Sequence, residues 1–129
     1  ETAVVENLAQ MDLVIEELRV LGCRFSLDDF GTGMASYSYL KRLSVDYLKI
    51  DGSFIRNILA DSVDQAMVRS MQEVASEVRV KTIAEQVDSN EALQLLKKIG
   101  IDYVQGYHLH RPQPLDEIRL EGGINEQVA

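Results

Sequence analysis

The sequence predicts an α/β fold that forms about half of a parallel β/α barrel of the TIM type, with about four β/α units. Short apolar segments alternate with longer segments of helical periodicity, and helical connections of this kind join parallel strands. Each expected strand ends in polar side chains, as strands do at the carboxyl end of a barrel, where active sites lie. The chain has 129 residues, about half of the roughly 250 that a full barrel needs.

Helices are expected where apolar residues recur every three or four positions. One such segment covers residues 2–21 and stops at Gly22, and a second long helix begins near Ser62. Shorter helical segments are expected at residues 36–43, 52–60 and 115–120. The inward-facing residues are expected to be Val4, Leu8, Met11, Ile15 and Leu18 in the first helix, and Met67, Val68, Met71, Val74 and Val78 in the second long one.

A further helix is expected after Asp88, because Asp88 and Glu91 have the spacing of a capping box. Its inner face would carry Leu93, Leu96 and Ile99, and Gly100 would end it. The expected strands lie between the helices, at residues 23–30, 45–51, 80–87 and 101–107. We assign residues 1–120 to the half barrel and residues 121–129 to a loose C-terminal tail.

Two of the strand lead-ins are alike. Residues 44–48 and 100–104 share a core of hydrophobic residue, Asp, Tyr and hydrophobic residue. This similarity indicates two β/α units that enter their strands in the same way, although it is too short to establish an internal repeat.

An open, doubly wound sheet is the alternative architecture. Its dinucleotide-binding loop carries a G-x-G-x-x-G pattern, in which bare backbone amides face the phosphates. The loop after the first expected strand reads DDFGTG instead, with two acids at its start. The barrel is therefore the preferred fold.

Composition narrows the function classes. The net charge of −8, with histidines counted as neutral, disfavours DNA or RNA as a partner, because such binding depends on Lys and Arg. Cys23 is the only cysteine, so no internal disulfide can form; we expect a buried thiol at a strand start and a reducing cytoplasmic location. No segment is apolar enough for a membrane span or resembles a signal peptide. Membrane attachment would come only from domains upstream.

The polar residues in the last part of each expected strand are the candidate site. They are Asp28 and Asp29, then Lys49 and Asp51, then Glu85, then Gln105. Each alone has an ordinary explanation as a turn, a cap or an ion pair. Four consecutive strands that present such residues at one end of a sheet favour a shared site.

The residue types point to a divalent cation. Lys49 and Asp51 are two apart and share a strand face, whereas Asp28 and Asp29 can act together only if the chain turns at that point. A pair of aspartates is suited to bridge two cations about 3.5–4 Å apart. Oxygen donors without a Cys or His cluster indicate Mg²⁺ or Mn²⁺.

The segments LDDFGTG, YLKIDGSFI, KTIAEQV and YVQGY, in this order, resemble the EAL-domain family of cyclic di-GMP phosphodiesterases. The resemblance implies the C-terminal half of a β/α barrel that uses two Mg²⁺ or Mn²⁺ ions to open cyclic di-GMP to linear pGpG. It implies that Asp28, Asp29 and Glu85 are metal ligands and that Lys49 contacts the attacking water or a phosphate oxygen. Asp51 would lie behind Lys49, Glu85 is a possible base, and Gln105 would orient the ligands.

The same resemblance concerns the loop from Phe30 to Tyr39. In the family this loop couples dimer contacts to metal binding, which assigns that role here to Phe30, Gly31, Thr32 and Gly33. Glu1 falls where the family has a glutamate that anchors the loop. The alternative for Glu1 is an acid favoured by the N-terminus of a helix, with no further role.

The resemblance has gaps. The Glu-Ala-Leu motif, the substrate-binding Arg that follows it, an Asn and an earlier Glu would all precede Glu1, which suggests a fragment that is inactive alone. Residues 34–36 and Gln86 also depart from the usual family sequence. A catalytically degenerate receptor for cyclic di-GMP and a dimerisation module remain alternatives. A half barrel leaves two sheet edges unpaired, so we expect a homodimer or association with the missing half.

Overall fold

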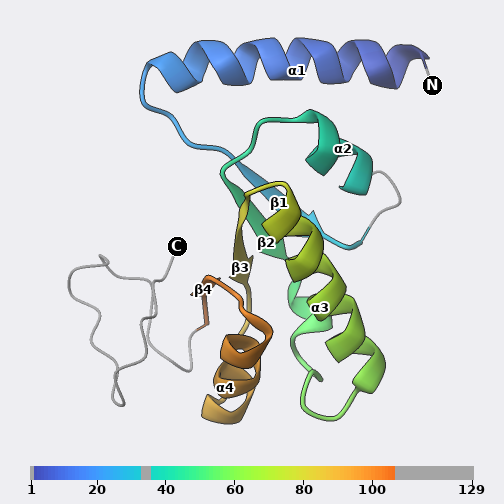
Figure 1. Ribbon diagram of the computed structural model, residues 1–129, viewed down its shortest axis with the longest axis vertical. Helices are drawn as coiled ribbons and strands as arrows, with labels where there is room; N and C mark the ends of the chain where they lie inside the picture. The colour runs from blue at the N-terminus through green and yellow to red at the C-terminus, as the bar shows by residue number, and fades with distance from the viewer. Residues whose placement is uncertain (1, 33–35, 107–129) are drawn as a thin grey trace.

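The computed structural model describes residues 2–32 and 36–106 (Figure 1). Four strands alternate with four α-helices, as the sequence predicts, but the helical segment expected at residues 52–60 is only a short 3₁₀ turn at Gly52–Phe54. In chain order the elements are α1 (Thr2–Val20), β1 (Ser26–Phe30), α2 (Ser36–Arg42), β2 (Tyr47–Ile50), η1 (Gly52–Phe54), α3 (Ser62–Glu77), β3 (Lys81–Ala84), α4 (Asn90–Ile99) and β4 (Tyr103–Val104).

The strands form one parallel sheet in the order β1-β2-β3-β4. Each strand lies beside its neighbour in sequence, and the order has no reversal of the kind that defines a doubly wound sheet. Ile50 is level with both Phe30 and Ala84, and Ala84 is level with Val104. The carboxyl ends of the four strands are therefore aligned, and the sheet is that of half a β/α barrel.

The main core lies between the sheet and the helices α3 and α4. It is a single cluster that includes Leu48, Ile50, Ala84 and Val104 from the strands and Val68, Met71, Ala75, Leu93 and Leu96 from the helices. Because side chains alternate along a strand, Lys49 and Ile83, which pair across β2 and β3, lie on the opposite sheet face. That face corresponds to the interior of a barrel.

A second, smaller cluster joins α1 to the β1 side of the sheet, where α1 and α2 lie together (Figure 1). Leu8 and Ile15 are buried there as predicted, but Met11 and Leu18 are 48% and 36% exposed. These two positions lie roughly 60–80° around the helix from Leu8. The contacting stripe of α1 is therefore narrower than the sequence pattern predicts.

The inner face of α3 also differs from the prediction. Val68 and Met71 are fully buried and Val74 packs against the core, but Met67 and Val78 are about 40% exposed. Ala75 takes the last buried position instead. Residues 68, 71 and 75 line one helical face, and Val78 is the residue that caps the helix end rather than part of its stripe.

Three local predictions are corrected by the structure. Cys23 is exposed in the connection between α1 and β1 rather than buried at a strand start, because β1 begins only at Ser26. Ser89, not Asp88, caps α4: its hydroxyl accepts a hydrogen bond from the amide of Ala92 at 3.1 Å. The fourth strand covers two residues, fewer than predicted. Gly100 ends α4 in a left-handed conformation, as expected.

The two similar lead-ins have the same structural role. The Asp46 carboxylate, before β2, accepts a hydrogen bond from the Phe25 amide at 2.8 Å, and the Asp102 carboxylate, before β4, accepts one from the Thr82 amide at 3.0 Å. In each case an aspartate satisfies a backbone donor of the preceding strand unit. The adjoining Tyr47 and Tyr103 rings then meet edge-to-face, with centroids 6.0 Å apart.

Asp46 also forms an ion pair with Arg19 of α1, with 3.0 Å between Oδ1 and Nη1. Burial alone would raise the pKa of Asp46, but the hydrogen bonds from Phe25 and Arg19 outweigh it and hold the pKa below its ordinary value. A lowered pKa contributes stability above the unfolded-state value of about 3.9, and this contribution is lost as the pH falls through the folded-state pKa.

We therefore expect Asp46→Ala in the full-length protein to lower the free energy of unfolding by about 1–2 kcal/mol at pH 7. The difference from the parent protein should begin to shrink below about pH 4, the unfolded-state pKa, and should be lost as the pH falls through the lower folded-state pKa of Asp46. Urea unfolding at several pH values measures both effects. Glu16→Ala, an exposed site on α1, is the control; an equal loss in the two variants would contradict the prediction.

Among the described residues, no helix is both long and apolar enough to cross a membrane.

Candidate metal centre at the carboxyl ends of the strands

Backbone hydrogen bonds carry the strand alignment one residue past each strand. The amide of Asp51 donates to the Phe30 carbonyl at 3.4 Å, that of Glu85 to Ile50 at 3.4 Å, and that of Gln105 to Ala84 at 2.9 Å. The residues that follow β2, β3 and β4 are thus fixed side by side at one edge of the sheet.

Three carboxylates meet at this edge. Asp28, Asp29 and Glu85 each place one oxygen within 4.8 Å of the others. Exposed acids often cluster without binding an ion, but here two of them are adjacent on one strand and the third is partly buried two strands away. Oxygen donors of this kind fit a divalent cation such as Mg²⁺ or Mn²⁺.

The backbone of Asp29 explains how two neighbouring side chains reach one place. Asp29 has a φ of +52°, and the pairing of β1 with β2 is irregular between Leu27 and Phe30. On a regular strand the two aspartates would point to opposite faces. The left-handed residue turns the chain, as the sequence analysis required, and aspartate tolerates this conformation better than most residues.

Lys49 provides the positive charge of the site. Its Nζ lies 3.0 Å from Oε1 of Glu85, and both side chains are only about one-fifth exposed. Lys49 projects from β2 on the face away from the helices, so it can reach a ligand at the strand ends as well as Glu85. The structure brings together four of the predicted residues: Asp28, Asp29, Lys49 and Glu85.

Asp51 lies at the border of this group. Its Oδ2 accepts a hydrogen bond from the Ser53 amide at 3.0 Å, which caps the turn η1. The hydrogen bonds from Ser53 hold the pKa of Asp51 below its ordinary value, with smaller contributions from Asp29 and Arg56. Asp51 is therefore ionised at neutral pH and held by its own turn, behind the cluster rather than within it.

Gln105 brings an unsatisfied acceptor. Its Oε1 is buried and has no hydrogen-bond partner among the described residues. A buried carbonyl oxygen without a donor is costly, typically by about 1–3 kcal/mol, unless a ligand or water supplies the donor. This orphaned atom follows β4 at the same edge and fits a role in orienting a metal-bound group.

The residue after it, Gly106, is fixed by close packing. A Cβ at this position would lie 2.0 Å from the carbonyl oxygen of Val87, a backbone atom that cannot move aside easily. We expect Gly106→Ala in the full-length protein to lower the free energy of unfolding by at least about 1–3 kcal/mol, as overpacking does.

Thermal unfolding by circular dichroism tests this against Gly22→Ala. Gly22 has a positive φ but open space around it, so that variant carries only the backbone cost of about 1 kcal/mol. The prediction fails if Gly106→Ala is no less stable than Gly22→Ala.

The structure describes three of the five residues that were assigned to loop coupling. Phe30 is buried in the core and its ring contacts Tyr37 edge-to-face at 5.0 Å, while Gly31, with a φ of +101°, leaves no room for a Cβ beside Phe54 and Met71. Thr32 is exposed and donates through its hydroxyl to the Asp29 carbonyl at 2.8 Å. Phe30, Gly31 and Thr32 thus tie the loop to the core and to Asp29. Glu1 and Gly33 lie outside the described residues.

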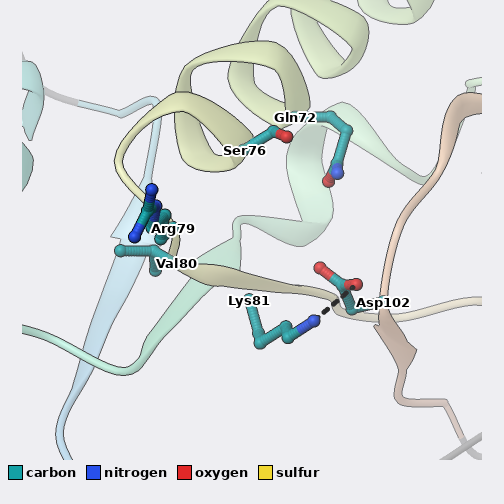
Figure 2. A pocket seen from close by; sticks show the side chains of 6 residues that line it. All are labelled: Gln72, Ser76, Arg79, Val80, Lys81 and Asp102. Atoms are coloured by element: carbon teal, nitrogen blue, oxygen red, sulfur yellow. Dashed lines mark ion pairs between the residues drawn. The ribbon is translucent and has the colours of Figure 1, made fainter.

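A pocket of about 290 Å³ lies elsewhere, at the amino-terminal ends of β3 and β4 (Figure 2). Gln72 and Ser76 reach toward it from α3, and the ion pair of Lys81 with Asp102, 3.8 Å long, crosses its floor. The carboxylate cluster follows the opposite ends of the strands. This pocket therefore plays no part in the candidate metal centre.

A comparison with known families decides the identity of the fold. The family model of the EAL domain matches residues 1–112. The chain belongs to the EAL domain family. Relatives of this EAL chain include the cyclic di-GMP phosphodiesterase PdeB of Shewanella oneidensis, which is 46% identical over 115 residues that make up 89% of this chain and 13% of PdeB.

Solved structures support the same family assignment. The EAL domain of Mycobacterium smegmatis DcpA matches 87% of this chain and 50% of its own, with 33% identity and a TM-score of 0.78. The manganese and cyclic di-GMP complex of Klebsiella pneumoniae BlrP1 matches 80% of this chain and 26% of its own, with 33% identity and a TM-score of 0.73. The EAL chain described here thus spans about half of a solved EAL domain.

Gln86 was not among the predicted site residues, although it departs from the usual family sequence, which commonly has glycine at this position. The structure gives Gln86 a φ of +57°, a conformation that glycine adopts freely. That departure was the available signal.

Proposed function

We propose that this chain forms the second half of an EAL barrel that hydrolyses cyclic di-GMP to linear pGpG with two divalent cations, Mg²⁺ or Mn²⁺. The observation that supports this most is the cluster of Asp28, Asp29 and Glu85 with Lys49 at the carboxyl ends of parallel strands. PdeB carries the activity in its name, and the BlrP1 structure contains both manganese and cyclic di-GMP.

The reaction adds one water molecule across one of the two phosphodiester bonds, which opens the ring. Asp28, Asp29 and Glu85 would hold the cations, whose chemistry is to acidify a water molecule and neutralise phosphate charge. Lys49 would donate a hydrogen bond to the attacking water or to a phosphate oxygen. Asp51, ionised and capped by Ser53, would support Lys49 from behind.

Two further groups complete the proposal. Glu85, within 3.0 Å of the Lys49 ammonium, is the candidate to accept the proton of the attacking water. The Gln105 carbonyl oxygen, which lacks a partner among the described residues, would accept a hydrogen bond from a metal-bound group and so orient the ligands. We place the reaction in the cytoplasm, in keeping with the single cysteine.

The edges of the sheet also enter the proposal. Strands β1 and β4 each have one paired neighbour among the described strands, and we infer that the first half of the barrel pairs with them and supplies the remaining ligands. A second copy of the chain is the alternative occupant.

The test is turnover by the full-length protein. Cyclic di-GMP is incubated with the purified protein and either MgCl₂ or MnCl₂, and products are separated by chromatography. We expect pGpG as the product and complete loss of turnover after treatment with EDTA, restored by added Mn²⁺. Binding of cyclic di-GMP without turnover under all conditions would contradict hydrolysis and support the receptor function instead.

A further inference from the structure

Gln86 directly follows Glu85, and its side chain makes a close contact with the turn that follows β2. Its carboxamide lies on Gly52: a Cβ at position 52 would be 2.4 Å from Cδ, 2.6 Å from Oε1 and 2.7 Å from Nε2 of Gln86. These are the three atoms nearest to that position. The side chain after β3 therefore occupies the space that a side chain at Gly52 would need.

Gly52 is part of the turn that carries Asp51. It is buried and begins η1, between Asp51 and the Ser53 amide that donates to the Asp51 carboxylate at 3.0 Å. The Gln86 carboxamide thus covers the Asp51 turn, from the neighbouring strand end. Apart from the adjacent residues Asp51 and Ser53, no other side chain comes nearer to the open side of Gly52 in the part of the chain that the structure describes.

The backbone of Gln86 directs its two neighbours to different places. With Gln86 in the left-handed region, Glu85 points to Lys49, while Val87 is buried in the core and its amide donates to Gln105 at 3.0 Å. A residue with a Cβ pays roughly 1–2 kcal/mol for this conformation. Strain of this kind concentrates at functional sites, where packing maintains it.

We propose that Gln86 is a positioning residue, whose carboxamide packs on Gly52 and fixes the Asp51 turn relative to Glu85. The proposal rests on the proposed function, since it concerns the same metal centre. It adds a residue outside the carboxylate cluster, and the contact needs both a long side chain at position 86 and a glycine at position 52.

The two sides of the contact can be changed independently in the full-length protein. Gln86→Ala removes the carboxamide, and Gly52→Ala displaces it, since the new methyl group takes its place. The Gly52 backbone is outside the left-handed region, so alanine adds no backbone strain there. Residues that support metal ligands typically change metal affinity by 10- to 100-fold. We expect each variant to weaken Mn²⁺ binding about tenfold, measured by calorimetry.

The double variant Gly52→Ala/Gln86→Ala is expected to bind Mn²⁺ no more weakly than either single variant, because both remove one contact. Gln86→Met keeps a long side chain, so it is expected to retain most of the Mn²⁺ affinity that Gln86→Ala loses. Gln94→Ala, an exposed glutamine on α4, is the matched control and should bind Mn²⁺ like the parent protein. Additive losses in the double variant, or unchanged Mn²⁺ affinity in both single variants, would overturn the proposal.

Two readouts separate this proposal from the proposed function. Mn²⁺ affinity is measured without substrate. A parent protein that binds Mn²⁺ but does not cleave cyclic di-GMP would refute hydrolysis, and the Mn²⁺ affinities of the Gln86 and Gly52 variants would still test the positioning role. The melting temperatures of the parent protein, the two single alanine variants Gln86→Ala and Gly52→Ala, and the double variant form a second double-mutant cycle. Non-additive shifts support the contact, and additive shifts contradict it even in a protein that binds no metal.

Discussion

Glu85→Gln in the full-length protein should lower the rate of cyclic di-GMP hydrolysis by at least about 100-fold, the lower end of what a general base contributes. The substitution keeps the size of the side chain but removes its charge. It takes one ligand from the carboxylate cluster and the ion-pair partner from Lys49. The fold should persist, because Glu85 is only partly buried and its amide still bonds to Ile50.

The dependence on Mn²⁺ concentration separates the two roles of Glu85. If Glu85 were only a ligand, high Mn²⁺ would restore much of the rate, whereas loss of the base cannot be restored in this way. Asp28→Asn provides the comparison, since Asp28 is proposed as a ligand and not as the base, and the activity that this variant loses should be partly rescued by Mn²⁺. Glu91→Gln, exposed in the first turn of α4, is the control for charge. Full activity of Glu85→Gln with Mg²⁺ would refute both roles.

The sequence was sufficient to predict the alternation of strands and helices and to nominate side chains that the structure places near one another. Strand-helix alternation is a strong periodic signal, and the barrel rule then places the polar residues near the carboxyl end of each strand at one edge. Asp28, Asp29, Lys49 and Glu85 were found in this way, and the structure brings them together. The similarity of the Asp46 and Asp102 segments was also visible in the sequence. In the structure each of these aspartates accepts a hydrogen bond from a backbone amide of the preceding strand unit.

What the sequence could not supply depends on local geometry. Asp88 and Ser89 are both competent caps, and only the extended backbone of Ser89, with its hydroxyl on the Ala92 amide, selects between them. Met11 and Leu18 fit a helical stripe, but the partner surface of α1 is too narrow to cover them. The left-handed backbones of Asp29 and Gln86 follow from tertiary constraint, and the sequence could indicate only that the chain must turn at Asp29 and that Gln86 departs from the usual family residue.

The isolated 129-residue chain is expected to release no detectable pGpG under conditions in which the full-length protein consumes its substrate completely. Mg²⁺ needs close to six oxygen ligands in octahedral geometry, and two ions need correspondingly more. The described residues offer three clustered carboxylates, and Asp51 and Gln105 follow their strands at the same edge of the sheet. Water can complete the coordination of a single weakly held ion, but it cannot fix two ions at the separation that catalysis requires.

The same experiment addresses the sheet edges. Among the residues that the structure describes, β1 and β4 each have one paired neighbour and no second sheet faces Lys49. The isolated chain should therefore self-associate, which size-exclusion chromatography with light scattering detects. Addition of a polypeptide that carries the first half of the barrel should then shift the chain to a one-to-one complex and restore turnover. Formation of pGpG by the isolated chain would show that the visible ligands suffice, and a well-ordered monomer would show that its edges need no partner.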